Sequence, residues 1–369
     1  MRHSLARHAG LIAILLAIAG LEACTPAPTP RSPAEVRAQI VRLLPPRTAD
    51  RQGWAGDIQA AFAALKVEPG NPNLCAALAV TEQESSFVAD PVVPGLGRIA
   101  LEEIDRRAEH RHVPLFVVHA ALRLSSHDGK SYADRIAAVR TERELSETFE
   151  DFIDAFPMGR RLLQGANPVH TGGPMQVSIA FAEQYSKAHA YPYPAAASIR
   201  HEVFSRRGGV YFGIAHLLAY PASYPQPLYR FADYNAGFYA SRNAAFQKAA
   251  SLASGIAIPL DGDLVGYGRQ GKQIGATEAA VRSLERQLEL TDAQVHRALE
   301  LGSSTKFERS TLYERVFDLA EQEQHHSLPR AILPRITLES PKITRRLTTE
   351  WFAKRVNQRY QRCLAKAGP

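Results

Sequence analysis

The sequence predicts a mainly α-helical protein, and three observations lead to that expectation. Apolar residues recur at helical spacing, as at Trp54, Ile58, Phe62 and Leu65. Helix-start signals are frequent, whereas a convincing run of alternating strand residues and an internal repeat are both missing. The composition is ordinary for a globular protein, with 45% hydrophobic and 22% charged residues. The sequence does not exclude short strands in the long loops.

The expected helices follow one another along the chain. A Ser-Pro-Ala-Glu segment at 32–35 combines an N-cap, a Pro at the first helical position and a capping-box Glu, and Pro45-Pro46 ends the helix that it begins. Further helices are expected at about 54–65, 73–86, 101–111 and 208–220. The C-terminal third is also expected to be helical, with a second capping box at Thr291–Gln294.

The N-terminus has the layout of an export signal. Basic residues precede an uncharged stretch from Ala9 to Leu21, which is too short to span a bilayer comfortably. The segment 21–24 (Leu-Glu-Ala-Cys) resembles a lipobox, so residues 1–23 are predicted to be a lipoprotein signal peptide and Cys24 the lipidated residue. Glu22 departs from that pattern, and an ordinary signal peptide with a chance Cys is the alternative. Residues 24–34 are Pro-rich and suit an extended tether.

Lipidation defines the expected location and one partner. By resemblance to bacterial lipoproteins, Thr25 after Cys24 favours the outer membrane, on its periplasmic face or at the cell surface, with membrane lipid held through the acylated Cys24. Cys75 and Cys363 then remain as a possible disulfide pair in an oxidising compartment, and two unpaired thiols are the alternative.

The charge balance gives a modest basic excess. The formal net charge is +7, and loss of Arg2, Arg7 and Glu22 with the signal peptide leaves +6. Such an excess favours polyanions such as cell-wall components. The sequence contains no Arg/Lys block and no recognition motif for nucleic acid, so no nucleic-acid partner is expected.

Three short segments carry the functional expectation: residues 84–87 (Glu-Ser-Ser-Phe), 173–177 (Gly-Pro-Met-Gln-Val) and 233–237 (Asp-Tyr-Asn-Ala-Gly). Together and in this order they resemble the soluble lytic transglycosylase and goose-type lysozyme families. The chain as a whole also resembles an uncharacterised family of enterobacterial outer-membrane lipoproteins. The first resemblance implies a lysozyme-like helical domain at 35–250 with a large helical insertion at about 88–171, followed by a C-terminal helical region at 251–369.

Glu84 is the predicted catalytic residue, and its place on the helix supports that independently. On an ideal helical wheel Glu84 falls between Ala77 and Val80, at the end of an apolar face. An apolar environment disfavours the charged carboxylate and raises its pKa, as a general acid requires near neutral pH. The alternative for Glu84 is a solvent-exposed acid at a helix end.

The same resemblance implies roles for five further residues. The Tyr234 hydroxyl would lie near the Glu84 carboxyl, Asn235 would bind an N-acetylated sugar, and Ser85 would orient the N-acetyl group. Met175 and Gln176 would line the glycan cleft. The expected partner is the peptidoglycan glycan strand. The expected activity is a lytic transglycosylase that cleaves between N-acetylmuramic acid (MurNAc) and N-acetylglucosamine (GlcNAc) with a single Glu as acid and base.

Two departures from the family pattern leave a second function as an alternative. Pro174 stands where the families have Leu, and Phe87 and Gly172 lie 85 positions apart in the sequence (172 − 87). The insertion between them could hold substrate, gate the cleft or block it. The alternative function is therefore a non-catalytic outer-membrane lipoprotein, glycan-binding or scaffolding, that retains a degenerate lysozyme-like core.

Other chemistries find little support in the sequence. The glycine pattern at 266–271 lacks a preceding buried strand, and no Gly-x-Ser-x-Gly elbow occurs. The pairs His110/His112 and His325/His326 lack a third ligand at metal-binding spacing. No metal and no cofactor are expected.

Overall fold

The computed structural model describes residues 31–159, 161, 164–194, 197–266, 274–338 and 345–368. The predicted signal peptide, Cys24 and most of the tether lie outside these residues. The described chain is mainly helical, which confirms the predicted fold class. Its strands are limited to two-residue pairs. Among the described residues, every helix is too short or too polar to cross a membrane.

Three helices build the N-terminal part of the central body: α2 (Pro33–Leu43), α3 (Arg51–Leu65) and α4 (Asn71–Ser85). The capping box predicted at 32–35 is formed, because Ser32 Oγ accepts from the Glu35 amide and the Glu35 side chain accepts from the Ser32 amide. α4 is buried along most of its length, with Leu74 and Val80 fully buried. It runs through the interior and brings its C-terminal end to the functional site.

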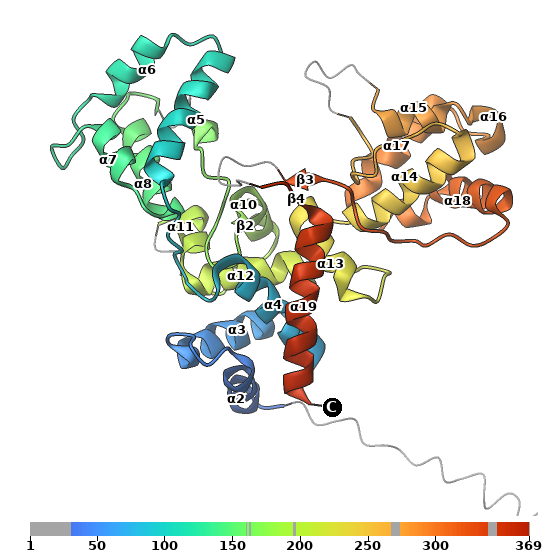
Figure 1. The fold of residues 1–369 in the computed structure, drawn as a ribbon, viewed down its shortest axis with the longest axis horizontal. Coiled ribbons are helices and arrows are strands. Elements are labelled where there is room, and N and C mark those ends of the chain that lie inside the picture. Colours follow the sequence, from blue (N-terminus) through green and yellow to red (C-terminus); the bar gives the residue numbers. More distant parts are fainter. Residues whose placement is uncertain are drawn as a thin grey trace, which may run out of the picture.

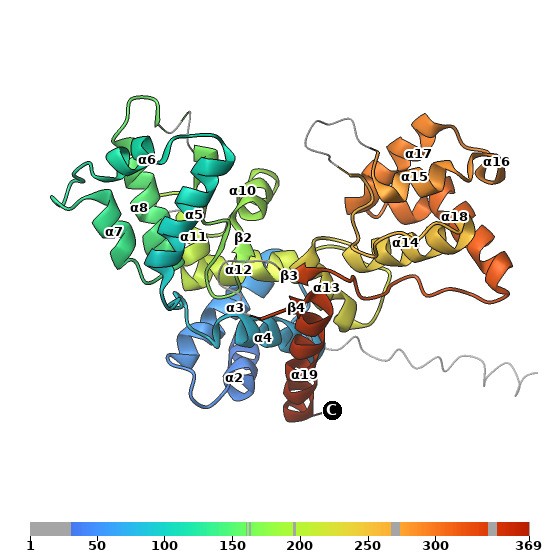
Figure 2. The ribbon, with the colours of Figure 1, turned by 45° about the horizontal axis from the view of Figure 1, so that its top comes forward.

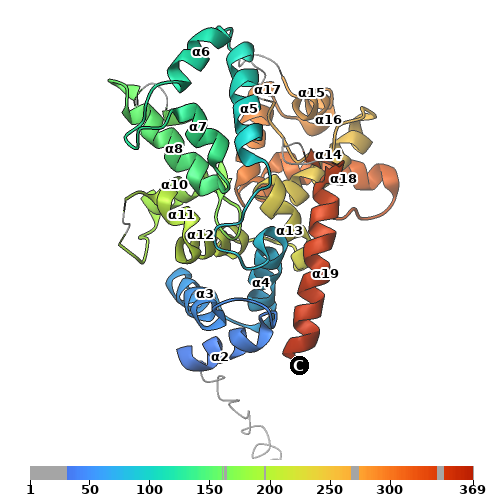
Figure 3. The ribbon, with the colours of Figure 1, turned by 60° about the vertical axis from the view of Figure 1, so that its left-hand side comes forward.

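Four helices then form a separate lobe, which we call the insertion lobe: α5 (Leu96–His110), α6 (Leu115–Leu122), α7 (Tyr132–Ala138) and α8 (Glu142–Asp154). At its base, the Val93 amide before α5 donates to the Arg140 carbonyl before α8 at 2.9 Å, which joins the entry segment to the start of α8. Figures 1 and 3 show this lobe projecting from the central body, with α6 at the end farthest from α2. The short 3-10 helix η1 (Gln164–Ala166) follows it.

The central body continues with a small antiparallel hairpin and four helices: β1 (Thr171–Gly172), β2 (Val177–Ser178), α10 (Ile179–Ala188), α11 (Ile199–Phe204), α12 (Arg206–Leu218) and α13 (Pro227–Ala236). In the hairpin Thr171 pairs with Ser178 and Gly172 with Val177. α12 is buried almost throughout and packs against α3, α11 and α13. Gly209 and Gly213 on α12 leave room for Pro174 and Met175, so the hairpin turn lies directly on this helix.

A second lobe, the C-terminal lobe, has its own hydrophobic core around Phe246, Phe307 and Phe317. Its elements are α14 (Ala240–Ser254), α15 (Ala276–Arg282), α16 (Glu285–Leu288), α17 (Asp292–Leu299), η2 (Glu300–Ser303), η3 (Phe307–Arg309) and α18 (Thr311–Gln324). The predicted capping box at Thr291–Gln294 is present. Figure 2 shows this lobe and the insertion lobe on opposite sides of the central body.

The last helix, α19 (Thr349–Ala367), leaves the C-terminal lobe. It packs along α4 and α13 in the hydrophobic core of the central body, which we call the first core. The pair β3 (Thr337–Leu338) and β4 (Leu347–Thr348) precedes it. The expected single C-terminal region at 251–369 is therefore divided between the two cores, and its expected boundary falls inside α14. The region is divided because α19 has an apolar face, and its Phe352 and Val356 are buried in the first core.

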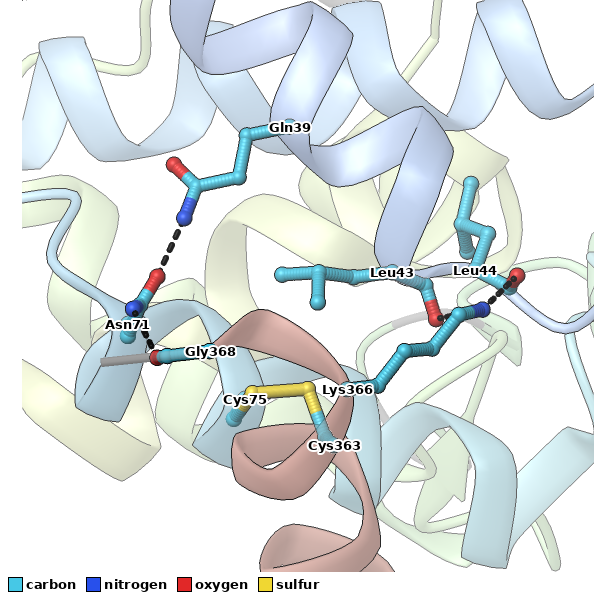
Figure 4. Close-up of a disulfide and its surroundings, with 8 residues drawn as sticks. All are labelled: Gln39, Leu43, Leu44, Asn71, Cys75, Cys363, Lys366 and Gly368. Atoms are coloured by element: carbon cyan, nitrogen blue, oxygen red, sulfur yellow. Dashed lines mark hydrogen bonds between the residues drawn. A yellow bond between two sulfur atoms is a disulfide. The ribbon is translucent and has the colours of Figure 1, made fainter.

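A disulfide joins Cys75 on α4 to Cys363 on α19, with the two Cα atoms 5.5 Å apart (Figure 4). The sequence left this pairing open. Beside it, the Lys366 ammonium donates to the Leu44 carbonyl at 3.1 Å, which ties the C-terminal turn of α19 to the end of α2. The disulfide thus holds the C-terminal helix against the helix that carries Glu84.

Candidate active site

A cleft of about 550 Å³ lies in the central body where the three predicted segments meet. Glu84 comes from the C-terminal end of α4, Gln176 from the hairpin turn, and Tyr234 and Asn235 from the end of α13. The other lining residues are aromatic, small or hydroxyl-bearing: Thr171, Ser178, Phe181, His216, Ala236, Gly237 and Phe238. The fold therefore brings Glu84 and Tyr234, 150 residues apart in sequence (234 − 84), to one cleft.

The end of α4 is held in a defined position. Ser86 and Phe87 both have left-handed backbone angles, with φ of 52° and 62°. Each such residue costs on the order of 1 kcal/mol or more, so surrounding contacts must offset the strain. The buried Phe87 ring supplies such a contact, because it packs edge-on against Trp54 of α3 with ring centroids 5.4 Å apart. The chain turns sharply after Glu84, and the carboxyl is left facing the cleft.

Burial raises the pKa of Glu84 to about 8. Its side chain is partly open to the cleft, but protein surrounds it on the other sides, and no Lys or Arg lines the cleft in the described part of the chain. Desolvation without a compensating cation favours the neutral carboxylic acid. Burial therefore shifts Glu84 toward its protonated, neutral form.

Glu84 is also the only acid among the cleft-lining residues that the structure describes. Two other carboxylates close to the cleft segments in sequence, Asp233 and Asp90, are engaged elsewhere. Asp233 accepts hydrogen bonds from the Tyr220 hydroxyl at 3.1 Å and from the Ser241 amide at 2.7 Å. Asp90 forms an ion pair with Arg143 at 2.9 Å. A mechanism with two opposed carboxylates, as in most glycosidases, would need a second carboxylate that the described lining of this cleft does not contain.

The Tyr234 hydroxyl lies under the cleft and donates a 2.7 Å hydrogen bond to the Met175 carbonyl. Burial and the neighbouring Glu84 carboxyl raise its pKa well above the ordinary value, so the phenol stays protonated. This bond links α13 to the hairpin turn. The two segments that resemble the lysozyme families are thus joined directly beside Glu84.

Two amide side chains line the cleft, and each is oriented by a neighbour. Asn235 Oδ1 accepts a 2.9 Å hydrogen bond from Thr349 Oγ1, at the start of α19. Gln176 Nε2 donates to Glu142 Oε2 at 2.8 Å, and Glu142 begins α8 of the insertion lobe. The cleft therefore contacts both the C-terminal helix and the insertion.

Ser85 and Met175 lie beside the cleft without lining it. The Ser85 hydroxyl donates to the Thr81 carbonyl at 3.2 Å within α4, and its side chain is buried. The Met175 side chain is fully buried, and its sulfur lies where a Cβ on Gly213 would be. Met175 takes part in the site through its backbone carbonyl. The sequence predicted that Met175 lines the cleft and that Ser85 orients the N-acetyl group, whereas neither side chain is part of the described lining.

Three aromatic residues that the sequence did not single out complete the cleft: Phe181, His216 and Phe238. The His216 ring packs 4.7 Å from the Phe181 ring and 4.6 Å from the Phe238 ring, measured between centroids. Burial lowers the pKa of His216 to about 4, so the imidazole is neutral. His216 lies within an apolar helix, and its only sequence signal was a polar residue among buried neighbours.

The insertion lobe contributes no lining residue to the cleft within the described chain, although α8 supports Gln176. In Figures 1 and 2 its helices stand to one side of α10 and α13. The described residues also contain no group of three or more potential metal ligands. The site is thus an apolar-walled cleft around one carboxyl whose pKa is raised by burial, a phenol and two amides.

A family model described as "Protein of unknown function (DUF1615)" matches residues 47–366, and the chain belongs to this family. The relative "Uncharacterized protein YaiW" of Escherichia coli (strain K12) is 52% identical over 356 residues, which is 96% of each chain. No solved structure matches the chain. The lysozyme-like core and the lipoprotein type stay predictions.

Proposed function

We propose that this protein is a peptidoglycan lytic transglycosylase with Glu84 as its acid and base. The observation that supports it most directly is the position of Glu84, whose pKa burial raises, in a cleft whose described lining contains no second carboxylate. A general acid must hold its proton at the working pH and reach the leaving oxygen. The convergence of Glu84, Gln176, Tyr234 and Asn235 at one cleft agrees with the resemblance to the lysozyme families.

In the proposed reaction Glu84 donates its proton to the glycosidic oxygen between MurNAc and GlcNAc, and the bond from MurNAc C1 to that oxygen breaks. The resulting Glu84 carboxylate then takes the proton of the MurNAc 6-hydroxyl, and the oxygen of this hydroxyl forms a bond to MurNAc C1. The product ends in a 1,6-anhydro ring, and Glu84 is protonated again. The substrate supplies the nucleophile, so one carboxyl is sufficient.

The experiment is digestion of purified peptidoglycan followed by mass analysis of the products. Wild type is expected to release 1,6-anhydro-MurNAc ends, and Glu84→Gln to release at most about 1% as many, because general acid catalysis contributes roughly 10²- to 10⁴-fold. Glu82→Gln is the matched control: Glu82 lies on the same helix but pairs with Arg359 and Arg362. It is expected to keep wild-type activity.

The other outcomes are equally informative. Products with a reducing MurNAc end would replace the transglycosylase with a hydrolase. Equal activity of wild type and Glu84→Gln would refute the role of Glu84. Absence of cleavage by wild type, with retention on insoluble peptidoglycan, would favour the alternative of a non-catalytic glycan-binding lipoprotein.

We also propose that Cys24 is acylated and anchors the protein in the outer membrane. The support is the signal-like segment 1–23 and the Pro-rich tether at 24–34. Labelled palmitate is expected to enter the wild-type protein and not Cys24→Ser. Membrane fractionation should place wild type in the outer-membrane fraction. Label in both proteins would contradict the assignment of Cys24.

A further inference from the structure

A second cavity, which we call the insertion pocket, lies in the insertion lobe away from the cleft. It has a volume of about 500 Å³, within the range of roughly 300 to 1,000 Å³ common for small-molecule sites. Its walls come from α5, α8, the start of α6 and the segment around η1. The apolar part of the wall includes Ile104, Val113, Val118 and Phe149.

The charged part of this wall is entirely cationic. Arg106, Arg107 and Arg111 line the pocket together with His110 and His170, and no acidic residue lines it in the described chain. Burial and the nearby Arg107 and Arg200 lower the pKa of His170, which leaves the permanent charge to the arginines. An apolar cavity with an arginine edge is complementary to a ligand with an apolar body and an anionic end.

The arginines retain a net positive charge after their own ion pairs are counted. Glu103 holds both Arg106 and Arg107, each with a nitrogen 2.6 Å from its Oε1. One carboxylate against two guanidinium groups leaves one positive charge. The Arg111 side chain forms no ion pair within the described residues and adds another. Arginine binds phosphate oxygens in bidentate geometry, which suits it to a phosphate head group.

The mouth of the pocket continues into an exposed apolar surface. Val113 lines the pocket and is 39% exposed, and the adjacent Phe116 and Val117 on α6 are 75% and 47% exposed. Within α6 only Leu122 is buried. Clustered large apolar side chains at a surface commonly mark an interaction site. Figure 3 shows α6 at the outer end of the lobe.

We propose that the insertion pocket binds the acyl chain of a membrane lipid, with the lipid phosphate held by the arginine edge. The chain would contact Ile104, Val113 and Phe149, and the head group would meet Arg111 and its neighbours. The pocket and the cleft share no lining residue, so lipid binding can be tested separately from glycan cleavage.

The test is calorimetric titration of the full chain with dodecyl phosphate, kept below its micelle concentration. The chain carries Cys24→Ser, so that no acyl chain at Cys24 competes for the pocket. Saturable binding is expected, at least tenfold tighter than that of dodecanol or of inorganic phosphate. Equal binding of dodecanol would show that charge plays no part. Equal binding of inorganic phosphate would show that the acyl chain plays none. Either result, or no binding of dodecyl phosphate, overturns the proposal.

Two matched pairs of exposed substitutions locate the site. Arg111→Glu and Val113→Asp alter the pocket and are each expected to weaken dodecyl phosphate binding at least tenfold. Arg123→Glu and Phe116→Asp alter the same surface outside the pocket, and less than a twofold change is expected. Equal losses for Arg111→Glu and Arg123→Glu, or for Val113→Asp and Phe116→Asp, would show that dodecyl phosphate binds the surface in general. Either result would overturn the proposed binding in the pocket.

Discussion

The central body and the insertion lobe differ in how far they bury their helices. α12 in the central body is buried almost throughout, whereas α6 in the insertion lobe buries only Leu122. The first arrangement fixes side chains, since Tyr234, Gln176 and Asn235 each have a hydrogen-bond partner at the cleft. The second leaves apolar side chains at the surface. The central body thus holds the cleft side chains in hydrogen-bonded positions, whereas the insertion lobe leaves apolar side chains exposed.

The largest expected effect concerns the pH dependence of the central site. Glu84 must be protonated to act as a general acid, and burial raises its pKa to about 8. Transglycosylase activity on peptidoglycan is therefore expected to fall about tenfold per pH unit above roughly pH 8. The measurement is the initial rate of anhydro-product release from pH 5 to 10. A rate that already falls above pH 5 would show that the cleft does not raise the pKa of Glu84.

A matched pair of phenylalanine substitutions tests the difference in burial directly. Phe212→Ala in α12 removes a fully buried ring and is expected to cost about 3 to 5 kcal/mol of unfolding free energy. Phe116→Ala in α6 removes an exposed ring and is expected to change it by less than about 0.5 kcal/mol. Denaturant unfolding of both variants measures the two changes. Similar losses would mean that α6 is covered in the folded protein.

Removal of the disulfide tests how the central body is held together. Cys75 and Cys363 are 288 residues apart in sequence, so their bond strongly restricts the unfolded chain. The double variant Cys75→Ser/Cys363→Ser is expected to lose about 2 to 5 kcal/mol. Thermal unfolding with and without a reductant measures the loss. Wild type under reducing conditions should match the double variant, and an unchanged wild-type Tm would contradict a stabilising bond.

The smallest expected effect is a gain in stability when the buried acid is neutralised. The folded pKa of Glu84 lies above its unfolded value, so the folded state binds the proton more tightly. Stability contributed by that proton is present below about pH 4.5 and is lost as pH rises toward 8. Glu84→Gln avoids this loss and should be roughly 2 kcal/mol more stable than wild type at pH 8, with the partial exposure of Glu84 limiting the gain.

The difference between Glu84→Gln and wild type should nearly vanish at pH 4. Thermal unfolding at pH 4, 6 and 8 measures it, with Glu82→Gln as the control. The Glu82 carboxylate is in contact with solvent and two arginines, and surface ion pairs contribute about 0 to 1 kcal/mol. A pH-independent difference for Glu84→Gln would indicate that Glu84 has the same pKa in the folded and unfolded states.

Part of the site was predictable because its signals are local. Glu84 was placed at the end of an apolar helix face from its spacing relative to Ala77 and Val80, and the structure buries both of these residues. The capping boxes at 32–35 and 291–294 likewise depend on residues three positions apart. His216 was missed, because a single polar residue in an apolar helix gives no information about the rings that will surround it.

The sequence by itself determined the helical class, the capped helix starts and the place of Glu84 on its helix. Only the tertiary structure decided that Cys75 pairs with Cys363, that α19 returns to α4, and that Met175 faces the interior. The physical reason is the range of the interactions. Capping and periodicity act within a few residues, whereas burial, pairing and desolvation depend on which distant surfaces meet. The raised pKa of Glu84 belongs to the second kind, because it arises from the walls that other segments build around the carboxyl.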